Sequence, residues 1–261
     1  VTKHIACIND LHTRLMPESY GRLFRLAHRA ILPALGRRAA YITTVSGLSR
    51  QHLIEYGVAP AEKIVVTYNG SDHAARWDAG RSALELPSRP YVMCLGRSQY
   101  HKNAGLLLKL ASQLDRIGLD LVMAGEVDRE TILRHVPEMP DNLRMPGHIS
   151  DDDFRKALSG ALCFLFPSRI EGFGLPAVEA MTCGCPVVAS TAPCLPEDPD
   201  AWIGQIVRLK DTDALRNRMI EAGLRRAQDF RWRRIAETYL ELMARLDNET
   251  VSPAREARRR A

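Results

Sequence analysis

The chain has 261 residues, of which 46% are hydrophobic and 26% are charged, a composition typical of soluble globular proteins with one large or two modest cores. No apolar run approaches the ~20 residues that a membrane-spanning helix needs, which excludes an integral membrane protein of that kind. The formal net charge is +5 at pH 7, but part of it comes from the tail "AREARRRA" at residues 254–261, so a uniformly basic surface does not follow.

Six cysteines occur without the CxxC spacing of a zinc site: Cys7, Cys94, Cys163, Cys183, Cys185 and Cys194. Several lie in apolar runs, where a reduced cysteine packs as a small hydrophobic residue. The "CGC" at 183–185 is the alternative, metal-binding feature, but no further ligands stand at a suitable spacing. The cysteines therefore predict a reduced, cytoplasmic protein without a metal site.

The first part of the chain alternates between predicted strands and predicted helices. Strands are expected at residues 4–8, 41–46 and 63–70, with helices over 21–40 and 49–57 between them. The helix over 21–40 is rich in arginine and is expected to be interrupted by Pro33. It could rest on an anionic membrane, although an ordinary amphipathic surface helix accounts for the same pattern.

A polar stretch at residues 71–90 separates this series from a second one. Further strands are predicted at 91–96, 119–125, 142–149, 163–168 and 186–190, with helices over 103–118, 129–136, 151–161 and 230–246. Alternation of this kind predicts parallel sheets, so the chain is expected to be α/β. The break near residues 74–90 predicts two sheets joined by a linker that acts as a hinge.

The stretch "SRIEGFGLPAVE" at residues 168–179 follows one of these strands, at the end where open parallel sheets bind ligands. Gly172 and Gly174 allow positive φ and a close approach of the backbone to a ligand. Pro176 suits the start of a helix that ends near Gly184, and the free amides at that start favour an anion. The alternative is a plain tight turn before a helix that begins with proline.

Two carboxylates belong to the same stretch. Glu179 is expected in the first turn of the helix, where the helix dipole favours it, and Glu171 stands at the mouth of the strand. On one helix they would be about 12 Å apart, too far for a glycosidase pair, which needs roughly 5–9.5 Å. They could instead bind two different hydroxylated parts of one long ligand.

A second polar loop, "LGRSQYHKN" at residues 95–103, ends the strand predicted at 91–96. The guanidinium of Arg97 and the ammonium of Lys102 suit a diphosphate. A pair of solvated surface cations is the alternative. The loop is not a dinucleotide fingerprint, because GxGxxG and the acidic residue that follows it are absent.

These motifs together resemble the retaining GT-B glycosyltransferases of family 4, the glycosyl transferases group 1. The resemblance is carried by "GRSQYHKN" and by the long motif "EGFGLPAVEAMTCGCPVVAS", and it extends from about residue 5 to residue 245. It implies an α/β GT-B fold of two Rossmann-like parallel-sheet domains that face a cleft. Residues 1–80 would form the C-terminal part of the acceptor domain, residues 88–235 the donor domain, and residues 236–261 a closing helix and basic tail. Because the family carries further strands before residue 4, the N-terminal domain is expected to be incomplete here.

The resemblance also implies a role for each motif residue. Arg97 and Lys102 would hold the diphosphate of a nucleotide sugar and stabilise the leaving group, Glu171 would contact the transferred sugar, and Glu179 would contact the ribose. Arg97, Lys102 and Glu171 would be the catalytic residues. His148 and Ile149 would lie near the base. The other expected donor-binding residues are Gly96, Gly172, Phe173, Gly174 and Leu175. The donor is expected to be a GDP- or UDP-hexose, with GDP-mannose favoured. No metal or other cofactor is expected, since no Asp-x-Asp metal motif stands where a divalent ion would otherwise stabilise the leaving group.

The chain departs from the family pattern in two places. Many members have His-Asp-Leu where this chain has Asn9-Asp10-Leu11, which leaves the following His12 as the candidate acceptor residue, although a lone histidine near a strand end is more often structural. A glycine- and alanine-rich stretch is also expected after Glu197, where the chain passes directly to "DPDAWIGQIVRL".

Three functions are therefore compared. The first is a retaining hexosyltransferase that acts on a saccharide or lipid-linked acceptor in surface polysaccharide or glycolipid synthesis, in the cytoplasm or on the inner face of the membrane. The second is a nucleotide-sugar-binding module without transferase activity. The third is a nucleic-acid-binding protein, but interleaved aromatic residues and known binding modules are lacking, so no nucleic acid partner is expected.

Overall fold

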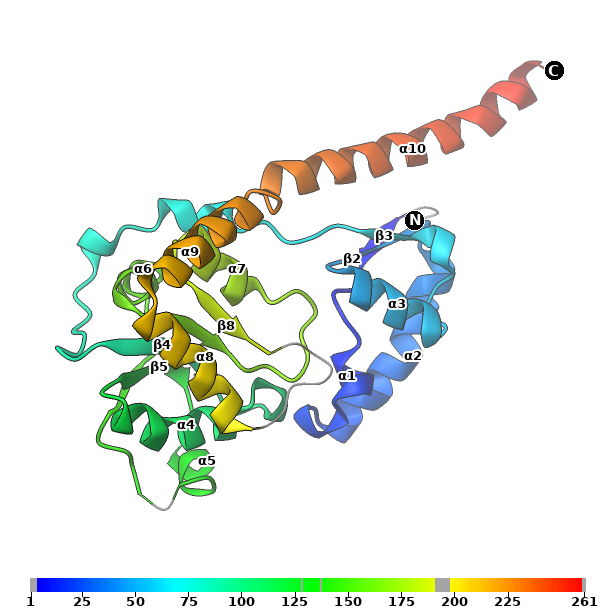
Figure 1. Ribbon diagram of the computed structural model, residues 1–261. Coiled ribbons are helices and arrows are strands. Elements are labelled where there is room, and N and C mark those ends of the chain that lie inside the picture. The colour runs from blue at the N-terminus through cyan, green and yellow to red at the C-terminus, as the bar shows by residue number, and fades with distance from the viewer. Residues whose placement is uncertain (1–3, 128, 137, 191–197, 260–261) are drawn as a thin grey trace. The chain divides into compact units, whose positions relative to one another are not determined.

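A computed structural model describes residues 4–127, 129–136, 138–190 and 198–259 of the chain (Figure 1). The chain divides into two units, one made of Val1–Gly70 with Phe230–Ala261 and the other of Ser71–Asp229. Both are built on parallel sheets, as the alternation of strands and helices predicts. The stretch expected to be rich in glycine and alanine borders residues 191–197, which lie outside the described residues.

The first unit contains a three-stranded sheet in the order β1-β2-β3. The strands are β1 (Ile5–Cys7), β2 (Tyr41–Thr44) and β3 (Ile64–Val66), and the helices are α1 (His12–Leu15), α2 (Arg22–Arg38), α3 (Gly47–Glu55) and α10 (Trp232–Arg259). Leu11, Ile42 and Leu53 are fully buried in its core. The helix α10, predicted over 230–246, joins this unit, where the Tyr239 hydroxyl lies 2.8 Å from the Thr43 hydroxyl.

The helix α2 runs through Pro33, so the predicted interruption is wrong. Proline removes one backbone donor from a helix, but tertiary packing can outweigh that loss. On either side of the proline, Leu32 and Gly36 are buried. A Cβ at Gly36 would collide with the carbonyl oxygen of Val58. The close approach of the two backbones holds the helix together beyond the proline.

The second unit contains a five-stranded parallel sheet in the order β6-β5-β4-β7-β8. Its strands are β4 (Tyr91–Arg97), β5 (Asp120–Glu126), β6 (Leu143–Gly147), β7 (Phe164–Phe166) and β8 (Val187–Ala189). Because all five strands are parallel, their carboxyl ends meet at one edge of the sheet. The chain leaves β4 first toward β5 and β6 and later returns to β7 and β8, so β4 is the topological switch point.

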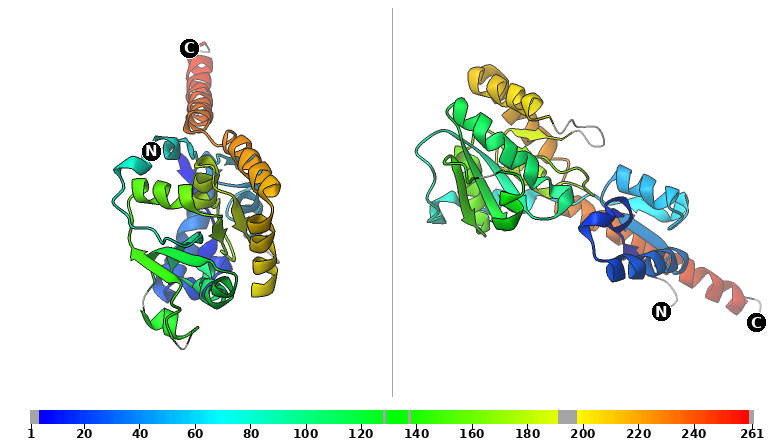
Figure 2. Two further views of the ribbon diagram at one scale, coloured as in Figure 1. Left: turned by 60° about the vertical axis from the view of Figure 1, so that its left-hand side comes forward. Right: turned by 90° about the horizontal axis from the view of Figure 1, so that it is seen from below.

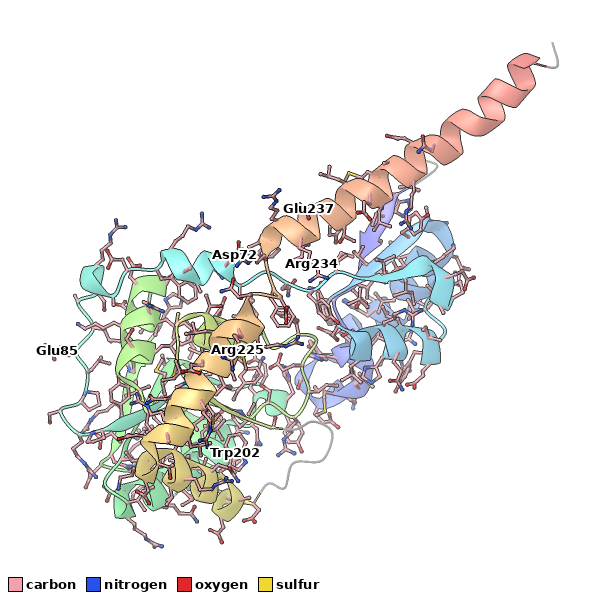
Figure 3. All side chains as sticks on the ribbon, turned by 45° about the horizontal axis from the view of Figure 1, so that its top comes forward. Asp72, Glu85, Trp202, Arg225, Arg234 and Glu237 are labelled. Atoms are coloured by element: carbon pink, nitrogen blue, oxygen red, sulfur yellow. The ribbon has the colours of Figure 1, made fainter. Side chains whose placement is uncertain are left out.

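Helices cover both faces of this sheet, as Figure 2 shows: α4 (Ala104–Arg116), α5 (Arg129–Leu133), α6 (Asp151–Gly160), α7 (Leu175–Thr182), α8 (Pro199–Asp211) and α9 (Asp213–Ala227). Alternate residues of β4 enter two different cores, as the two-residue period of a strand requires. Val92 and Cys94 pack with α4 and α8, whose Trp202 is buried (Figure 3). Tyr91 and Met93 pack with α6 and α7.

The polar stretch predicted as a linker near residues 74–90 packs on the second unit. The rings of Trp77 and Phe154 are 5.9 Å apart, the backbone N–H of Asp78 donates to the Asp152 carboxylate (2.7 Å), and Leu84 packs against the core. The boundary between the units therefore falls after Gly70, and the chain returns to the first unit at residue 230. The assignment of an acceptor domain and a donor domain stays a prediction.

No helix in the described part of the chain is both long enough and apolar enough to cross a membrane.

Candidate functional site

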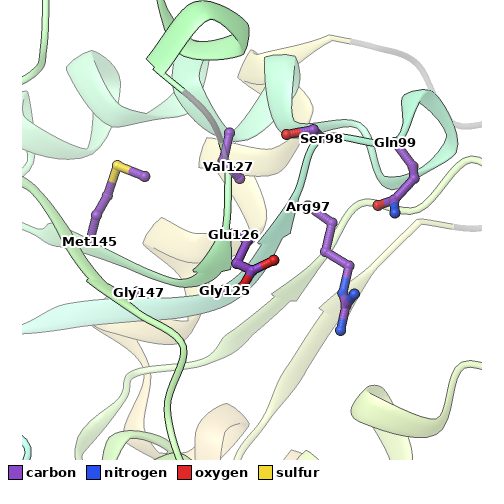
Figure 4. Close-up of a pocket in the computed structure, with 8 residues that line it drawn as sticks. All are labelled: Arg97, Ser98, Gln99, Gly125, Glu126, Val127, Met145 and Gly147. Atoms are coloured by element: carbon purple, nitrogen blue, oxygen red, sulfur yellow. The ribbon is translucent and has the colours of Figure 1, made fainter.

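A cavity of about 590 Å³ lies at the carboxyl edge of the five-stranded sheet (Figure 4). Arg97, Ser98 and Gln99 from the end of β4 lie on one side, Met145 and Gly147 from β6 lie on the other, and Gly125, Glu126 and Val127 from the end of β5 lie between them. Arg97 is thus at an open cavity, as a ligand-binding cation must be. Glu126, which sequence reasoning missed, faces Arg97 in the register of the two strands.

Packing beneath this cavity explains why residue 96, which is expected to bind the donor, is a glycine. A Cβ at Gly96 would lie 2.6 Å from Cγ of Met123 and 2.7 Å from Cγ2 of Val127. Its register partner Gly125 has a φ of +106°, and a Cβ there would collide with the carbonyl oxygen of Gly96. The close pairing of β4 and β5 at the cavity floor therefore requires both glycines.

Lys102 and Glu171, which the sequence analysis expects to contact different parts of a ligand, contact each other. Lys102 ends a short 3₁₀ helix (Tyr100–Lys102) after β4, and its Nζ lies 2.6 Å from Oε1 of Glu171 in the loop after β7. The two side chains are 26% and 21% exposed, so water screens the pair only partly. A ligand phosphate would have to compete with Glu171 for this lysine.

Several other contacts join the same two loops. The backbone N–H of Arg169 donates to the carbonyl of His101 (2.8 Å), and its Nη2 donates to Oδ1 of Asn103 (3.3 Å). Asn103 is left-handed (φ 56°) and donates through Nδ2 to the carbonyl of Pro167 (3.4 Å). The Arg169 guanidinium lies 4.4 Å from the centre of the Tyr100 ring. Sequence reasoning missed all of these contacts. Asparagine before a helix was the available signal, since asparagine tolerates this conformation and is favoured at helix starts.

The turn before α7 is as the sequence predicts at Gly174. Gly174 has a φ of +84°, and a Cβ there would lie 3.2 Å from Cε1 of Phe166. The helix α7 starts at Leu175, with a proline in its first two positions, and ends before Gly184. Gly172 is buried and does not belong to the positive-φ glycines of the described chain, so the freedom that glycine allows is used at Gly174 and not at Gly172.

Glu179 lies just beyond the first turn of α7, whereas the prediction placed it within that turn. The helix begins at Leu175, no acidic residue stands in its first turn, and Glu179 is only 9% exposed. Its Oε1 lies 2.9 Å from Nε2 of His73. Burial raises the pKa of Glu179, an effect that the hydrogen bond to His73 partly offsets and the nearby charge of Asp151 adds to. Stabilisation by the helix dipole therefore does not explain this carboxylate.

His73 is the second residue that sequence reasoning missed. It lies on the 3₁₀ helix Asp72–Arg76. A second contact holds this segment against α7, because the hydroxyl of Ser71, just before the 3₁₀ helix, is 2.9 Å from the hydroxyl of Thr182. The Trp77 ring packs edge-on against the His73 ring at 5.5 Å. His73 is therefore held in place as the partner of Glu179.

Other predicted residues lie away from this cavity or in the other unit. His148 is exposed and Ile149 packs against the core, whereas their neighbour Gly147, with a φ of 74°, lines the cavity. His12 belongs to the first unit and is buried; its backbone N–H donates to Oδ1 of Asp10 (2.9 Å), and its Nδ1 is 3.6 Å from the same oxygen. Its expected role as an acceptor residue stays a prediction.

Among the residues that the structure describes, no cluster of three or more histidine, cysteine or acidic side chains could hold a metal ion. Cys163, Cys183 and Cys185 are buried and free, and burial raises the pKa of each thiol, to about 12 for Cys185. The thiols of the "CGC" motif therefore pack as apolar groups.

Sequence comparison gives the site its context. The model of a family described as glycosyl transferases group 1 matches residues 78–222. The O-antigen chain mannosyltransferase B of Escherichia coli is 31% identical over 219 residues, which cover 74% of this chain and 58% of that protein. The chain spans 58%, 60% and 53% of the lengths of three curated relatives that it matches.

Solved structures agree with the sequence comparison in fold. Sucrose-phosphate synthase from Thermosynechococcus elongatus matches with a TM-score of 0.77 and 21% identity, over 94% of this chain and 68% of that chain. Alr3699/HepE of Anabaena, solved in complex with UDP and glucose, matches with a TM-score of 0.70 and 20% identity, over 92% and 71% of the two chains. At such identities the likeness shows the GT-B fold alone. The family match covers more than half of the 261 residues and includes both polar loops, and it places the chain in the glycosyl transferases group 1.

Proposed function

We propose that this chain is part of a retaining glycosyltransferase that moves a hexose from a nucleotide sugar to a saccharide or lipid-linked acceptor in surface polysaccharide or glycolipid synthesis. The observation that carries the proposal is the pairing of Lys102 with Glu171 at the carboxyl edge where Arg97 lines a cavity. A cation for phosphate and a carboxylate for hydroxyl groups then stand at adjacent positions, as the two halves of a sugar phosphate require.

The proposed chemistry assigns the cations to the leaving group. As the bond from sugar to phosphate breaks, negative charge gathers on the nucleoside diphosphate, and Arg97 and Lys102 lower the barrier by stabilising it. Glu171 accepts hydrogen bonds from hydroxyls of the sugar, and Glu179 accepts them from the ribose. The acceptor hydroxyl attacks from the face that the phosphate leaves and gives its proton to the departing phosphate oxygen, so no side chain of the enzyme serves as the nucleophile.

The relatives support two donors. The Escherichia coli relative is named as a mannosyltransferase, and the Anabaena structure holds UDP and glucose. Together with the family resemblance, these names keep a GDP-hexose and a UDP-hexose as candidates, and mannose is the sugar that we favour.

A specific observation supports a second candidate function, a nucleotide-sugar-binding module without transferase activity. Asn9 stands where the resemblance to the family leads us to expect histidine, and the backbone N–H of the neighbouring His12 donates to Asp10. Such a module would bind a donor without consuming it.

The helix α2 supports a location on the inner face of a membrane. Four large apolar side chains of this helix are at least half exposed, and arginines lie among them: Leu23, Phe24, Leu26 and Ile31, with Arg22 and Arg29. Apolar and cationic groups together suit an anionic lipid surface. Leu23→Ser combined with Leu26→Ser should reduce sedimentation with phosphatidylglycerol vesicles, whereas Leu224→Ser in the second unit should not.

The experiment that tests the proposed function is a thermal stabilisation screen with UDP- and GDP-sugars. A ligand at 100 times its Kd adds about 2.7 kcal/mol of stability, and Lys102→Gln should reduce that gain. Release of nucleoside diphosphate from the stabilising donor, in the presence of a crude lipid acceptor, separates the transferase from the binding module. Stabilisation by none of these compounds would contradict both.

A further inference from the structure

The loops that carry Lys102 and Glu171 extend well beyond the hydrogen-bonded part of the sheet. The paired residues of β4 and β7 end at Cys94 and Leu165, several residues before either functional side chain. Strand pairing therefore cannot fix the distance between Lys102 and Glu171. Contacts between the loops themselves must do so.

One of the two loops has a firm anchor of its own. Asn103 follows Lys102 directly and is the N-cap of α4, whose Leu107 and Leu110 are fully buried. The Lys102 side of the site is thus attached to a rigid helix. The Glu171 side approaches it through Arg169, two residues earlier in the chain.

The Arg169 side chain spans the gap with two kinds of contact. Its guanidinium donates to Asn103 (3.3 Å) and lies 4.4 Å from the ring centre of Tyr100, so it touches residues on both sides of Lys102. A planar cation can stack on an aromatic ring and donate a hydrogen bond at the same time, which suits arginine for this position.

We propose that Arg169 is a positioning residue that holds the loop carrying Lys102 against the loop carrying Glu171. The inference rests on the proposed function, because it requires these two side chains to face the phosphate and the sugar of one donor. A nucleotide sugar touches both loops and needs their spacing to be fixed. A nucleoside diphosphate lacks the sugar that Glu171 is proposed to contact, so its binding is less sensitive to that spacing.

The test compares Kd values by calorimetry for two pairs of probes, GDP with GDP-mannose and UDP with UDP-glucose, using the whole 261-residue chain. Arg169→Gln removes a cation–π contact and a weak hydrogen bond. For whichever nucleotide sugar binds the wild type, the rise in Kd should be about fivefold larger than the rise in Kd of the matching diphosphate. Arg169→Lys should restore only part of the affinity, because lysine keeps a cation near the ring but lacks the planar group that stacks and donates at once. Arg116→Gln, at an exposed arginine at the far end of α4, is the matched control.

Tyr100 provides an independent variant that leaves Arg169 in place. Tyr100→Leu removes the ring and should reproduce the effect of Arg169→Gln, whereas Tyr100→Phe keeps the ring and should not. Equal weakening of sugar and diphosphate, or an unchanged ratio in Tyr100→Leu, would overturn the proposal for Arg169 while leaving the proposed function intact. Failure of the wild-type chain to bind any of the four probes would overturn both.

Discussion

Glu171→Gln should tighten the binding of free nucleoside diphosphate, although it alters a residue of the proposed site. The substitution keeps the shape of the side chain and removes the charge that lies 2.6 Å from the Lys102 ammonium. In the wild type, a phosphate must displace this carboxylate before it gains the lysine. In the variant, that competition is much weaker.

The exposure of the pair sets the size of the effect. Fully exposed ion pairs contribute about 0.2–1 kcal/mol, and hydrogen bonds to charged groups contribute roughly 1.5–3 kcal/mol. With side chains 26% and 21% exposed, Lys102 and Glu171 lie between these cases. About 1 kcal/mol is therefore expected, which corresponds to a Kd for the diphosphate about fivefold lower.

Calorimetric titration of GDP and UDP measures this change, and a double-mutant cycle isolates its cause. In a Lys102→Gln background, Glu171→Gln should no longer improve the affinity for the diphosphate. For a nucleotide sugar the sign should reverse, because the sugar loses its charged acceptor. A Glu171→Gln variant that binds the diphosphate more weakly than the wild type would refute the reasoning.

Four other substitutions test the remaining parts of the site. Arg97→Ala and Lys102→Ala should each raise the Kd of the diphosphate about tenfold or more, as loss of a charge-assisted hydrogen bond requires; unchanged values in both would make them ordinary surface cations. Burial raises the pKa of Glu179 above its ordinary 4.5, so its native form binds the proton more tightly, and stability is lost as the pH rises through that raised pKa. The Tm of Glu179→Gln relative to wild type should therefore increase between pH 4.5 and neutrality, and a constant difference would contradict this. Gly174→Ala should lower the Tm by roughly 2–8 °C, because alanine is strained at positive φ; Gly47→Ala, where a Cβ meets nothing within 4 Å, is the control that should not.

The strands could be predicted because each is a short apolar run bounded by turn residues. The run "YVMCLG" corresponds to β4 and "LDLVMAG" to β5. Both strands begin and end within one residue of their predicted bounds. Local chemistry also fixed the start of α7, where Gly174 supplies the positive φ and Pro176 follows it. Features decided by neighbouring residues in the chain were therefore accessible from the sequence.

Features decided by tertiary packing were not accessible in this way. Proline normally breaks a helix, but α2 continues through Pro33 because Gly36 packs against the backbone at Val58. The stretch near residues 74–90 is polar in composition, yet Trp77 and Leu84 attach it to the second unit. Neither outcome can be deduced from periodicity, since each depends on a partner brought close only by the fold.

The partners within the site were hidden for the same reason. Lys102 and Glu171 are 69 residues apart in the chain, and His73 and Glu179 are 106 apart. The sequence identified three of these four residues as chemically important. It could not show that they satisfy one another, because that depends on how loops from distant strands meet at one edge of the sheet.

This mutual pairing shapes what binding can gain. Glu171 accepts from Lys102 and Glu179 pairs with His73, so a ligand that engages these side chains exchanges hydrogen bonds and adds few new ones. Exchange of this kind contributes little net affinity, but a ligand that fails to replace a partner leaves a partly buried charge unsatisfied, which costs about 1–3 kcal/mol. The penalty falls on ligands that lack a phosphate beside a hydroxylated sugar. If the proposed function holds, the pairs that stabilise the site should therefore also make it selective, and selectivity should be lost before stability when one partner of a pair is neutralised.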